Sequence, residues 1–496
     1  MTSAAAFSTE LTRLLRAGAR GLWLATDDEA RALAVLDDVG RELGWPVHTW
    51  SAAAGTDGEG VARPVTEILE RLRGNRDEAL WVLLDTGGLL DLTALRRCRE
   101  LAQRVHGPAI VLLERSTAIA SALTRIPELV YLTLPPPDAA ELTERLLSIA
   151  DTLQTGGWQH AAERLEHGAA AIVGAAAGLP AYAYERILAE AVLACGLEVE
   201  AIVGYIRASK PQLLGRDGLL EPIAAWAAQR LGGLERLKAW LALRKLTFTP
   251  AAAAAGIGPA RGCLLVGVQG CGKSLAARVC AGELDLPLVR LEPGRLFGGT
   301  VGASEANLRQ ALADVDCIAP VVLWIDELDK AFAGAEGSAS DAGTAARVLG
   351  GLLTWLQERT RPVFVVATAN RVDLLPAELL RRGRFDEIFF IDLPDADARE
   401  QIAYVHWTAA MAGNPAAPSG SRWSDFARVA RTADGYSGAE IAAALAEARL
   451  LAFAQGRPVG PDDFAAALAA SIPLSVLRAE DVTALRRWAS GRARPA

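Results

Sequence analysis

A glycine-rich segment at residues 267–274, GVQGCGKS, has the residue types and the spacing of a phosphate-binding loop. Glycines let the backbone wrap closely around phosphate groups, with N–H groups and the start of the following helix turned toward the negative charge. Lys273, one of only five lysines in the chain, can reach the β- and γ-phosphates, and the Ser274 hydroxyl can bind Mg²⁺. The nucleotide contacts expected in this segment are Gly267, Gln269, Gly270, Cys271, Gly272, Lys273, Ser274 and Leu275.

Two acids, Asp326 and Glu327, directly follow the apolar run 321–325. Adjacent carboxylates at the end of a buried strand are costly unless a cation lies beside them. In that position Asp326 can hold Mg²⁺, and Glu327 can orient and deprotonate an attacking water. Asn370 follows another apolar run, where an amide can polarise the same water or touch the γ-phosphate, although an ordinary turn residue is the alternative. The set predicts nucleotide hydrolysis.

Arginines cluster in the segment 380–386, LRRGRFD. Such a cluster is usually a solvated face. In a ring assembly, however, an arginine that reaches the γ-phosphate of a neighbouring subunit accelerates hydrolysis by about 10³–10⁵. The planar guanidinium suits this contact better than a lysine would. The three arginines of this segment are therefore candidates for catalysis in trans.

Strands and helices are expected to alternate in both halves of the chain. Apolar strands that alternate with helices predict a parallel sheet covered on both faces. Helical periodicity follows each set of strands, over about 138–210 and 397–490. The expected strands are 21–25, 81–85, 109–113 and 129–132 in the first half, and 263–266, 288–291, 321–325, 363–367 and 388–391 in the second.

Composition narrows the class of protein. Of the 496 residues, 51% are hydrophobic and 22% are charged, which excludes a disordered or collagen-like chain. The net charge of −8 argues against nucleic acid as the default ligand. No apolar run is long enough to suggest a membrane span, and the N-terminus lacks an apolar signal-peptide core. The six cysteines form no CxxC motif, which favours a reducing, cytoplasmic location.

Together the motifs resemble those of the AAA clade of AAA+ ATPases over about residues 228–470. The segment 231–234, LGGL, is similar to the clade's adenine-side signature, 302–305 to its "GESE" motif, and 435–440, GYSGAE, to its lid signature. The resemblance implies ATP and Mg²⁺ as cofactors and a homo-hexameric ring in which Arg381 and Arg384 act on the neighbouring subunit. It also implies that four residues lie near the adenine: Leu231, Gly232, Gly438 and Ala439.

A closer resemblance extends over nearly the whole chain, to the chloroplast-reading-frame AAA ATPases of algal plastids and cyanobacteria. It is carried by residues 267–275 and 321–332, by GRLFGG at 294–299, by IPLS at 472–475 and by the C-terminal segment 485–495.

The first half resembles a nucleotide-binding sheet without its chemistry. The loop after its first strand, TDDEA at 26–30, has neither glycine nor lysine, and its acids would repel phosphate. Thr86 stands where the second acid of an acid-tipped strand would be. The expected fold class is thus α/β: a P-loop AAA+ module, with a parallel sheet and a helical lid, preceded by a degenerate RecA-like α/β domain with its own helical segment. An unrelated α/β domain is the alternative for the first half.

Four domains are expected on this basis. Residues 1–137 form the degenerate RecA-like domain and 138–227 its helical lid and linker. Residues 228–395 form the large ATPase subdomain, and 396–496 the helical small subdomain with the C-terminal tail.

Two residues depart from the AAA pattern. Thr300, in FGGTV at 297–301, occupies the place where the pore loop of AAA unfoldases usually carries an aromatic residue. Threading of a substrate chain through the ring is therefore in doubt. Cys271 stands where threonine is common in the phosphate loop. Its thiol can be acidified by Lys273 and the helix N-terminus, which would make it a redox brake, or it can be an inert small residue.

The function predicted from the sequence is that of an ATPase, hydrolysing ATP to ADP and phosphate, that remodels or activates a protein partner as a hexameric ring. A DNA-handling AAA+ motor, such as a clamp loader or a helicase, is one alternative. A nucleotide-gated scaffold is the other, although an intact Glu327 and two candidate arginine fingers weigh against it.

Overall fold

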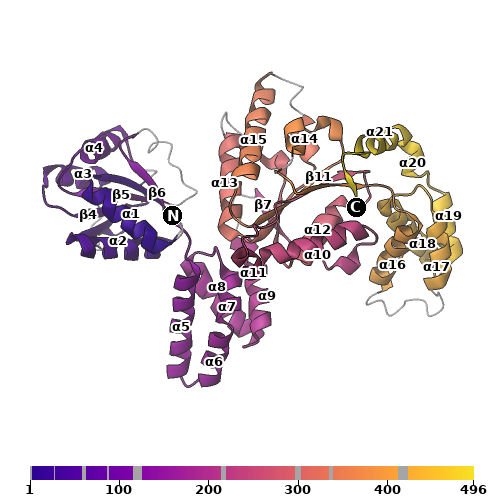
Figure 1. The fold of residues 1–496 in the computed structure, drawn as a ribbon, viewed down its shortest axis with the longest axis horizontal. Helices are drawn as coiled ribbons and strands as arrows, with labels where there is room; N and C mark the ends of the chain where they lie inside the picture. Colours follow the sequence, from indigo (N-terminus) through magenta and orange to yellow (C-terminus); the bar gives the residue numbers. More distant parts are fainter. Residues whose placement is uncertain are drawn as a thin grey trace. The chain divides into compact units, whose positions relative to one another are not determined.

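The computed structural model (Figure 1) describes residues 3–26, 28–57, 63–86, 89–114, 126–213, 219–296, 303–333, 339–381, 383–411 and 423–496. The chain divides into two compact units, Met1–Ile206 and Arg207–Ala496. Each unit contains one β-sheet and its own set of helices.

The first unit is built on a six-stranded sheet with the order β3-β2-β4-β5-β1-β6. All neighbouring strands are parallel except β2 and β3. Strand β2 was not expected from the sequence, because its half-buried residues VHTWS form no apolar run. The strands are β1 (Gly21–Ala25), β2 (Val47–Ser51), β3 (Gly55–Thr56), β4 (Leu80–Leu84), β5 (Ala109–Glu114) and β6 (Val130–Thr133).

Helices cover both faces of this sheet (Figure 1). Apolar side chains of α1 and α2 pack on one face and those of α3 and α4 on the other. A helical segment, α5 to α9, follows β6. The helices are α1 (Ala4–Arg16), α2 (Glu29–Leu43), α3 (Val65–Gly74), α4 (Leu92–Ala102), α5 (Ala139–Thr155), α6 (Gln159–His167), α7 (Ala169–Ala176), α8 (Ala181–Cys195) and α9 (Val199–Ser209).

The second unit contains a seven-stranded sheet with the order β13-β12-β8-β11-β10-β9-β7. Only the pair of β7 and β9 is antiparallel. The strands are β7 (Leu220–Ile223), β8 (Gly262–Gly267), β9 (Leu288–Leu291), β10 (Val321–Ile325), β11 (Val363–Ala369), β12 (Glu387–Ile391) and β13 (Arg494–Pro495).

The two sheets share one topology. Strands taken in chain order occupy the positions 5-1-4-3-2, as β6-β1-β5-β4-β2 in the first unit and β12-β8-β11-β10-β9 in the second. Each sheet also carries an antiparallel strand, β3 or β7, beside its second strand. The expected fold class is thus confirmed: the P-loop module is preceded by a RecA-like α/β domain with its own helical segment.

In the second unit, α13, α14 and α15 cover one face of the sheet, and α10 and α12 cover the other (Figure 1). Helices α16 to α19 follow β12 and pack around an apolar core of their own; they are called the lid below. The helices are α10 (Glu235–Lys245), α11 (Pro250–Ala254), α12 (Lys273–Leu284), α13 (Ala303–Ile318), α14 (Leu328–Ala333), α15 (Ala339–Glu358), α16 (Ala396–Met411), α17 (Trp423–Thr432), α18 (Gly438–Ala454), α19 (Pro461–Ala469), α20 (Leu474–Leu477) and α21 (Ala479–Ala489).

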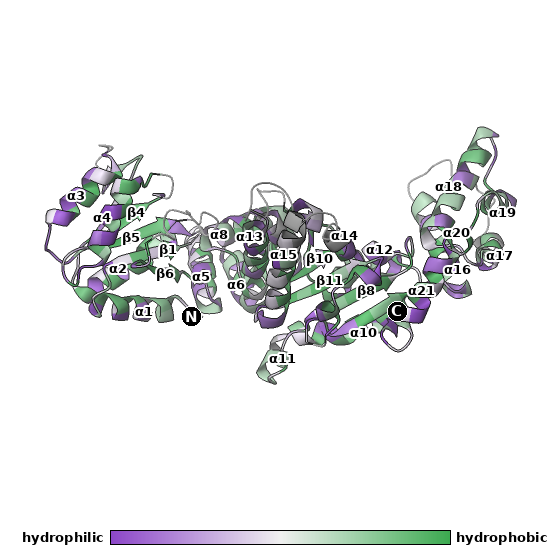
Figure 2. Cartoon of the chain, turned by 90° about the horizontal axis from the view of Figure 1, so that it is seen from above, coloured by the Kyte–Doolittle hydropathy of each residue, from purple (hydrophilic) through white to green (hydrophobic). Residues whose placement is uncertain are grey.

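The hydropathy of the elements explains these layers. In Figure 2 the strands of both sheets have the hydrophobic colour, whereas the helices around them carry both colours. Strands β8, β10 and β11 are buried along their whole length, as the central strands of a covered parallel sheet must be. Among the described helices, none is both long and apolar enough to cross a membrane.

The C-terminal segment returns from the lid to the sheet. Leu485 and Trp488 of α21 pack against the apolar core between the sheet and α13–α15. Arg486 Nε donates to Asp392 Oδ2 at 2.8 Å, just after β12. The chain then adds β13 to the edge of the sheet, where Arg494 pairs with Phe389. The tail therefore joins the two parts of the ATPase module.

In the first unit, charged groups hold the loop after β1 against the helical segment. Asp28 is buried, and its Oδ2 accepts a hydrogen bond at 2.8 Å from the N–H of Ala181, the first residue of α8. The buried guanidinium of Arg31 donates to both carboxylate oxygens of Glu141, at 2.7 and 2.9 Å. It also donates to the Pro135 carbonyl. A carboxylate is favoured at a helix N-terminus, so the contact of Asp28 helps to hold this loop against α8.

The Arg31 contact should control how easily α5 and α8 open. Replacing Arg31 with Ala removes one partner of a buried ion pair, and we expect the local opening free energy to fall by about 3 kcal/mol. Amide hydrogen exchange of peptides from 139–155 and 181–195 measures this in the full chain. Arg41→Ala is the matched control, because Arg41 lies on the same helix and its ion pair with Asp38 is exposed. Equal exchange in both variants would contradict the assignment.

Candidate functional site

A cavity of about 320 Å³ lies at the carboxyl end of the second sheet, between the sheet and the lid. This is the place where open parallel sheets bind ligands. The predicted site residues that line it are Leu231, Gly232, Gln269, Gly270, Cys271, Gly272, Lys273, Ser274, Leu275, Asp326, Glu327, Asn370, Gly438 and Ala439. Three predicted residues, Gly267, Arg381 and Arg384, are not part of its lining.

Glycines allow the tight course of the loop between β8 and α12. Gly270 and Gly272 have φ angles of 76° and 89°, which favour glycine. Gly267 does not line the cavity, but its φ is 154° and a Cβ there would lie 2.0 Å from the Ile391 carbonyl oxygen. It is therefore required for the approach of β8 to β12. The loop leads directly into α12, whose first turn offers its N–H groups to an anion.

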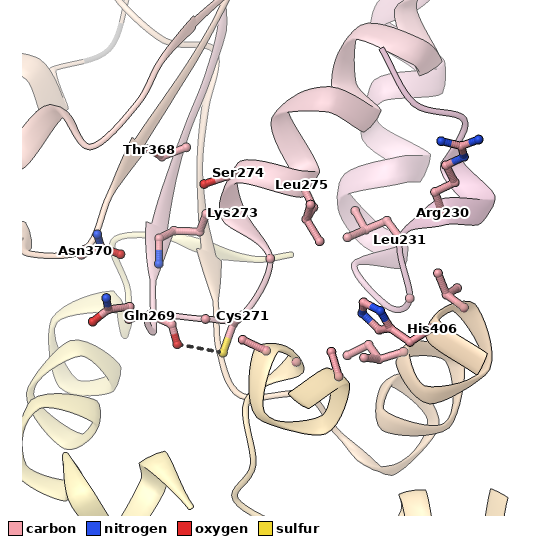
Figure 3. Close-up of a pocket in the computed structure, with 18 of the residues that line it drawn as sticks. Arg230, Leu231, Gln269, Cys271, Lys273, Ser274, Leu275, Thr368, Asn370 and His406 are labelled. Carbon is pink, nitrogen blue, oxygen red and sulfur yellow. Dashed lines mark hydrogen bonds between the residues drawn. The ribbon is translucent and has the colours of Figure 1, made fainter. Parts of the chain in front are cut away.

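Lys273 is the buried cation of the cavity. Only 7% of its surface is exposed, and its Nζ donates to the carbonyls of Gly267 and Val268, both at 2.8 Å. Burial lowers the pKa of the Lys273 ammonium to about 8, against the smaller raising effect of nearby charges including Asp326 and Glu327. A buried ammonium of this kind gains from an anionic ligand, because the anion replaces the lost hydration. Figure 3 shows Lys273 beside Ser274 and Asn370.

The two acids directly follow β10 and line the cavity together with Lys273. Glu327 has a φ of 49°, a left-handed conformation that is strained for a residue other than glycine. Its N–H donates to the Thr368 hydroxyl at 2.9 Å, and that hydroxyl donates to Asp326 Oδ1 at 2.7 Å. The Glu327 carboxylate pairs at its Oε2 with Lys330 Nζ, 2.6 Å away. This hydrogen bond raises the pKa of Lys330.

The opposite side of the cavity is mostly apolar. Leu231 and Leu275 lie there together with His406 (Figure 3), and burial lowers the pKa of the His406 imidazole. Gly232 lies so close to α16 that a Cβ would come within 2.6 Å of the Ile402 nitrogen. The sequence analysis missed four lid residues, Ile402, Val405, His406 and Ala442, because they form part of ordinary helical patterns without a motif.

The lid touches the phosphate loop directly. The N–H of Ala439, in the first turn of α18, donates to the Gly270 carbonyl at 3.0 Å. Ser437 caps this helix and forms a capping box with Glu440. A Cβ on Gly270 would lie only 3.1 Å from Ser437 Oγ. A backbone hydrogen bond and a close packing contact therefore join the phosphate loop to the lid beside the cavity.

The predictions for the arginine cluster and for Thr300 concern residues that do not line the cavity or that are not among the described residues. Arg381 is exposed, and Arg384 donates to the Glu378 carbonyl. Neither lines the cavity of its own chain. Arg382 and the segment 297–302, which includes Thr300, lie outside the described residues.

The hypothesis of an acidified Cys271 thiol is wrong. Burial raises the pKa of this thiol to about 12, and the opposing effect of the Lys273 charge is smaller. The sulfur contacts the Gln269 carbonyl oxygen at 3.8 Å (Figure 3). A protonated thiol is a poor nucleophile, so Cys271 fits the role of a small packing residue.

Comparisons with known proteins match both units. Residues 263–393 match the "ATPase family associated with various cellular activities (AAA)", and residues 7–132 match the "SpoVK-like AAA ATPase, N-terminal domain". The chain is 34% identical over 505 residues to the uncharacterized AAA domain-containing protein ycf46 of Trieres chinensis, covering 98% of both chains. The chain belongs to the ycf46 family of AAA domain-containing proteins.

Other relatives agree with this assignment. The ycf46 protein of Guillardia theta is 36% identical over 406 residues, which are 81% of this chain and 77% of that protein. A cell division cycle protein 48 homolog of Archaeoglobus fulgidus is 32% identical over 274 residues, 54% of this chain and 36% of that protein. The resemblance seen in the sequence is confirmed, and the chain is a member of the AAA ATPase family.

The raised pKa of Cys271 predicts low reactivity. At pH 7.5 we expect iodoacetamide to label the exposed Cys317 well before Cys271, because only thiolates react readily. Mass spectrometry of digested protein measures both sites. Cys271→Ala should bind nucleotide much as the wild type does. Preferential labelling of Cys271 would restore the hypothesis of a redox brake.

Proposed function

We propose that this chain hydrolyses ATP to ADP and phosphate with Mg²⁺, using the cavity between the second sheet and the lid. The observation that carries the proposal is the convergence of one buried cation, two carboxylates and an amide on a glycine loop at a helix N-terminus. Lys273, Asp326, Glu327 and Asn370 come from three different elements, yet all line one cavity. No structural need explains that combination.

The phosphate groups would be held by the loop. Gln269, Gly270, Cys271, Gly272 and Leu275 would surround them with backbone, and Lys273 would exchange its two carbonyl partners for phosphate oxygens. Ser274 and Asp326 are hard oxygen ligands suited to Mg²⁺, which neutralises charge on the transferred phosphoryl group. Gly267 would set the course of the loop.

Glu327 would accept the proton of the attacking water, and Asn370 would orient that water. The carboxylate must first leave Lys330, its partner in the present conformation. The adenine would lie on the apolar side, against Leu231, Gly232, Gly438 and Ala439. Because α18 contacts both this side and Gly270, loss of the γ-phosphate can be transmitted to the lid.

A homo-hexameric ring is supported by the arginines. Arg381 and Arg384 lie outside their own chain's cavity, as residues acting on a neighbour must. The ring would use lid motion to remodel or activate a protein partner in the cytoplasm.

The chain would be divided into four parts for this activity. Residues 1–137 and 138–227 would be the non-hydrolysing module and its helical linker, and 228–395 and 396–496 the large and small ATPase subdomains.

A DNA-handling motor is the second candidate, but the net charge of −8 disfavours it. Stimulation of the ATPase by DNA that is lost at high salt would favour that candidate. A nucleotide-gated scaffold would need neither a general base such as Glu327 nor arginines that act on a neighbouring subunit.

Glu327→Gln should bind ATP but lose at least about 100-fold in kcat, because the amide accepts no proton. A coupled phosphate-release assay and calorimetry measure the two quantities. Glu358→Gln, at the exposed end of α15, is the matched control. The ATP-bound Glu327→Gln protein should also retain its protein client in affinity capture. Wild-type turnover by this variant would exclude Glu327 as the base.

Arg381→Ala and Arg384→Ala should bind ATP normally and hydrolyse it poorly. Mixing either variant with Lys273→Ala should recover part of the activity, because one subunit then supplies the arginine and its neighbour the intact site. Arg457→Ala, an exposed lid variant, should hydrolyse ATP normally by itself. If subunits demonstrably mix and no activity returns, the arginines do not act in trans.

A further inference from the structure

One hydroxyl group connects the two acids of the proposed ATPase site. Thr368 lies in β11 with 2% of its surface exposed, and it is one of the residues that line the cavity. The hydroxyl donates to Asp326 Oδ1 at 2.7 Å and accepts from the Glu327 N–H at 2.9 Å. A hydroxyl offers one donor and two acceptor positions, so its donor and one acceptor serve two adjacent residues.

The position of Thr368 follows from strand register. Ile325 of β10 pairs with Ala367 of β11. The next residues, Asp326 and Thr368, are therefore opposite each other where the strands end. Here the chain turns sharply, since Glu327 has its φ of 49°. A single non-glycine residue in that region costs about 1–2 kcal/mol, so the turn needs a contact that holds it.

The first unit also has a hydrogen bond from a threonine hydroxyl to a carboxylate between the two equivalent strands, but each group lies on the other strand. There Thr86 follows the equivalent strand β4, and its hydroxyl donates to Glu114 Oε1 at 2.7 Å, at the end of the equivalent strand β5. Both residues are buried, at 0% and 3% exposure. The hydroxyl and the carboxylate have exchanged strands. In the first unit the hydroxyl residue thus occupies the place of Glu327, and the carboxylate is used to join the strands.

We infer that Thr368 is a positioning residue for ATP hydrolysis, whose one hydroxyl holds the magnesium-binding carboxylate of Asp326 and the backbone of the base Glu327 in a fixed relation. The inference rests on the proposed function. It predicts that loss of the hydroxyl disturbs the Mg²⁺ contact and the placement of the base together, while the phosphate loop and the adenine side remain intact.

The test compares Thr368→Val, which has nearly the same shape, with Thr368→Ser, which keeps the hydroxyl. In Thr368→Val we expect kcat to fall about 10–100-fold with little change in KM, the usual range for a residue that orients a metal ligand. The Mg²⁺ concentration for half-maximal activity should rise. Thr368→Ser should restore kcat to within about threefold of the wild type, because the hydroxyl bonds remain.

A readout independent of turnover is the gain in nucleotide affinity on adding Mg²⁺, measured with a fluorescent ATP analogue and with EDTA. Thr368→Val should keep the affinity seen in EDTA and lose most of the gain. If wild-type protein binds the analogue but releases no phosphate, the proposed hydrolysis fails. The effect of Thr368→Val on the Mg²⁺-dependent gain in affinity still tests the role of Thr368.

Thr86→Val is the matched control, because it removes the corresponding buried bond from the first unit. It should leave kcat and the Mg²⁺ gain unchanged, and melting temperatures of all variants report on folding. Wild-type values of kcat and Mg²⁺ gain in Thr368→Val would overturn the inference. Equal losses in Thr86→Val and Thr368→Val would also overturn it, since the effect would then be one of general stability.

Discussion

The contact between the phosphate loop and the lid is the interaction on which the second unit depends. The sheet supplies Lys273 and the acids, and the lid supplies the apolar side of the cavity, so neither part has a complete site alone. Their junction consists of backbone groups at close range, with the Ala439 N–H on the Gly270 carbonyl. A Cβ at Gly270 would lie 3.1 Å from Ser437 Oγ, so this close approach adds to the φ of 76° that already favours glycine there. A ligand in this cavity must contact both parts.

The first unit also has a junction between its sheet and its helical segment, and it forms this junction with side chains of its own. It has the same strand order, and its helical segment also follows the fifth strand. Instead of a phosphate loop it has Asp28 on the N-terminus of α8 and Arg31 on Glu141. These internal charges stabilise the contact between the sheet and the helices, since a buried pair is costly to break. The junction of the first unit is thus fixed by side chains of the chain itself, whereas the junction of the second unit borders the cavity.

The sequence predicted most of the residues that line the cavity, because its motifs are local. GVQGCGKS and the two acids after an apolar strand specify their own geometry, and the pattern of apolar strands predicted most of both sheets. Features formed by residues far apart were missed. Strand β13 has two residues and no pattern, His406 lies in an ordinary helix, and Thr368 reads as one residue of an apolar strand. Its role depends on register between β10 and β11, which no single segment encodes. Of the two alternatives for Cys271, the acidified thiol failed because burial is a tertiary property that outweighs the nearby charge.

The C-terminal tail gives the lid a second covalent route to the sheet. Ser475 packs on Gly435, where a Cβ would lie 2.2 Å from its hydroxyl oxygen, and its N–H donates to the Gly435 carbonyl at 3.3 Å. Gly435 directly precedes the Tyr436–Ser437 turn that begins α18, the helix in contact with the phosphate loop. From there α21 runs back to Asp392, and β13 pairs with β12. Any rotation of the lid about the β12–α16 connection must therefore also move or strain the tail. Residues 472–475 and 485–495, which carried part of the family resemblance, lie at the two ends of this C-terminal tail. Neither segment is part of the cavity lining that the structure describes, and their contacts are with the start of the lid helix α18 and with the edge of the sheet.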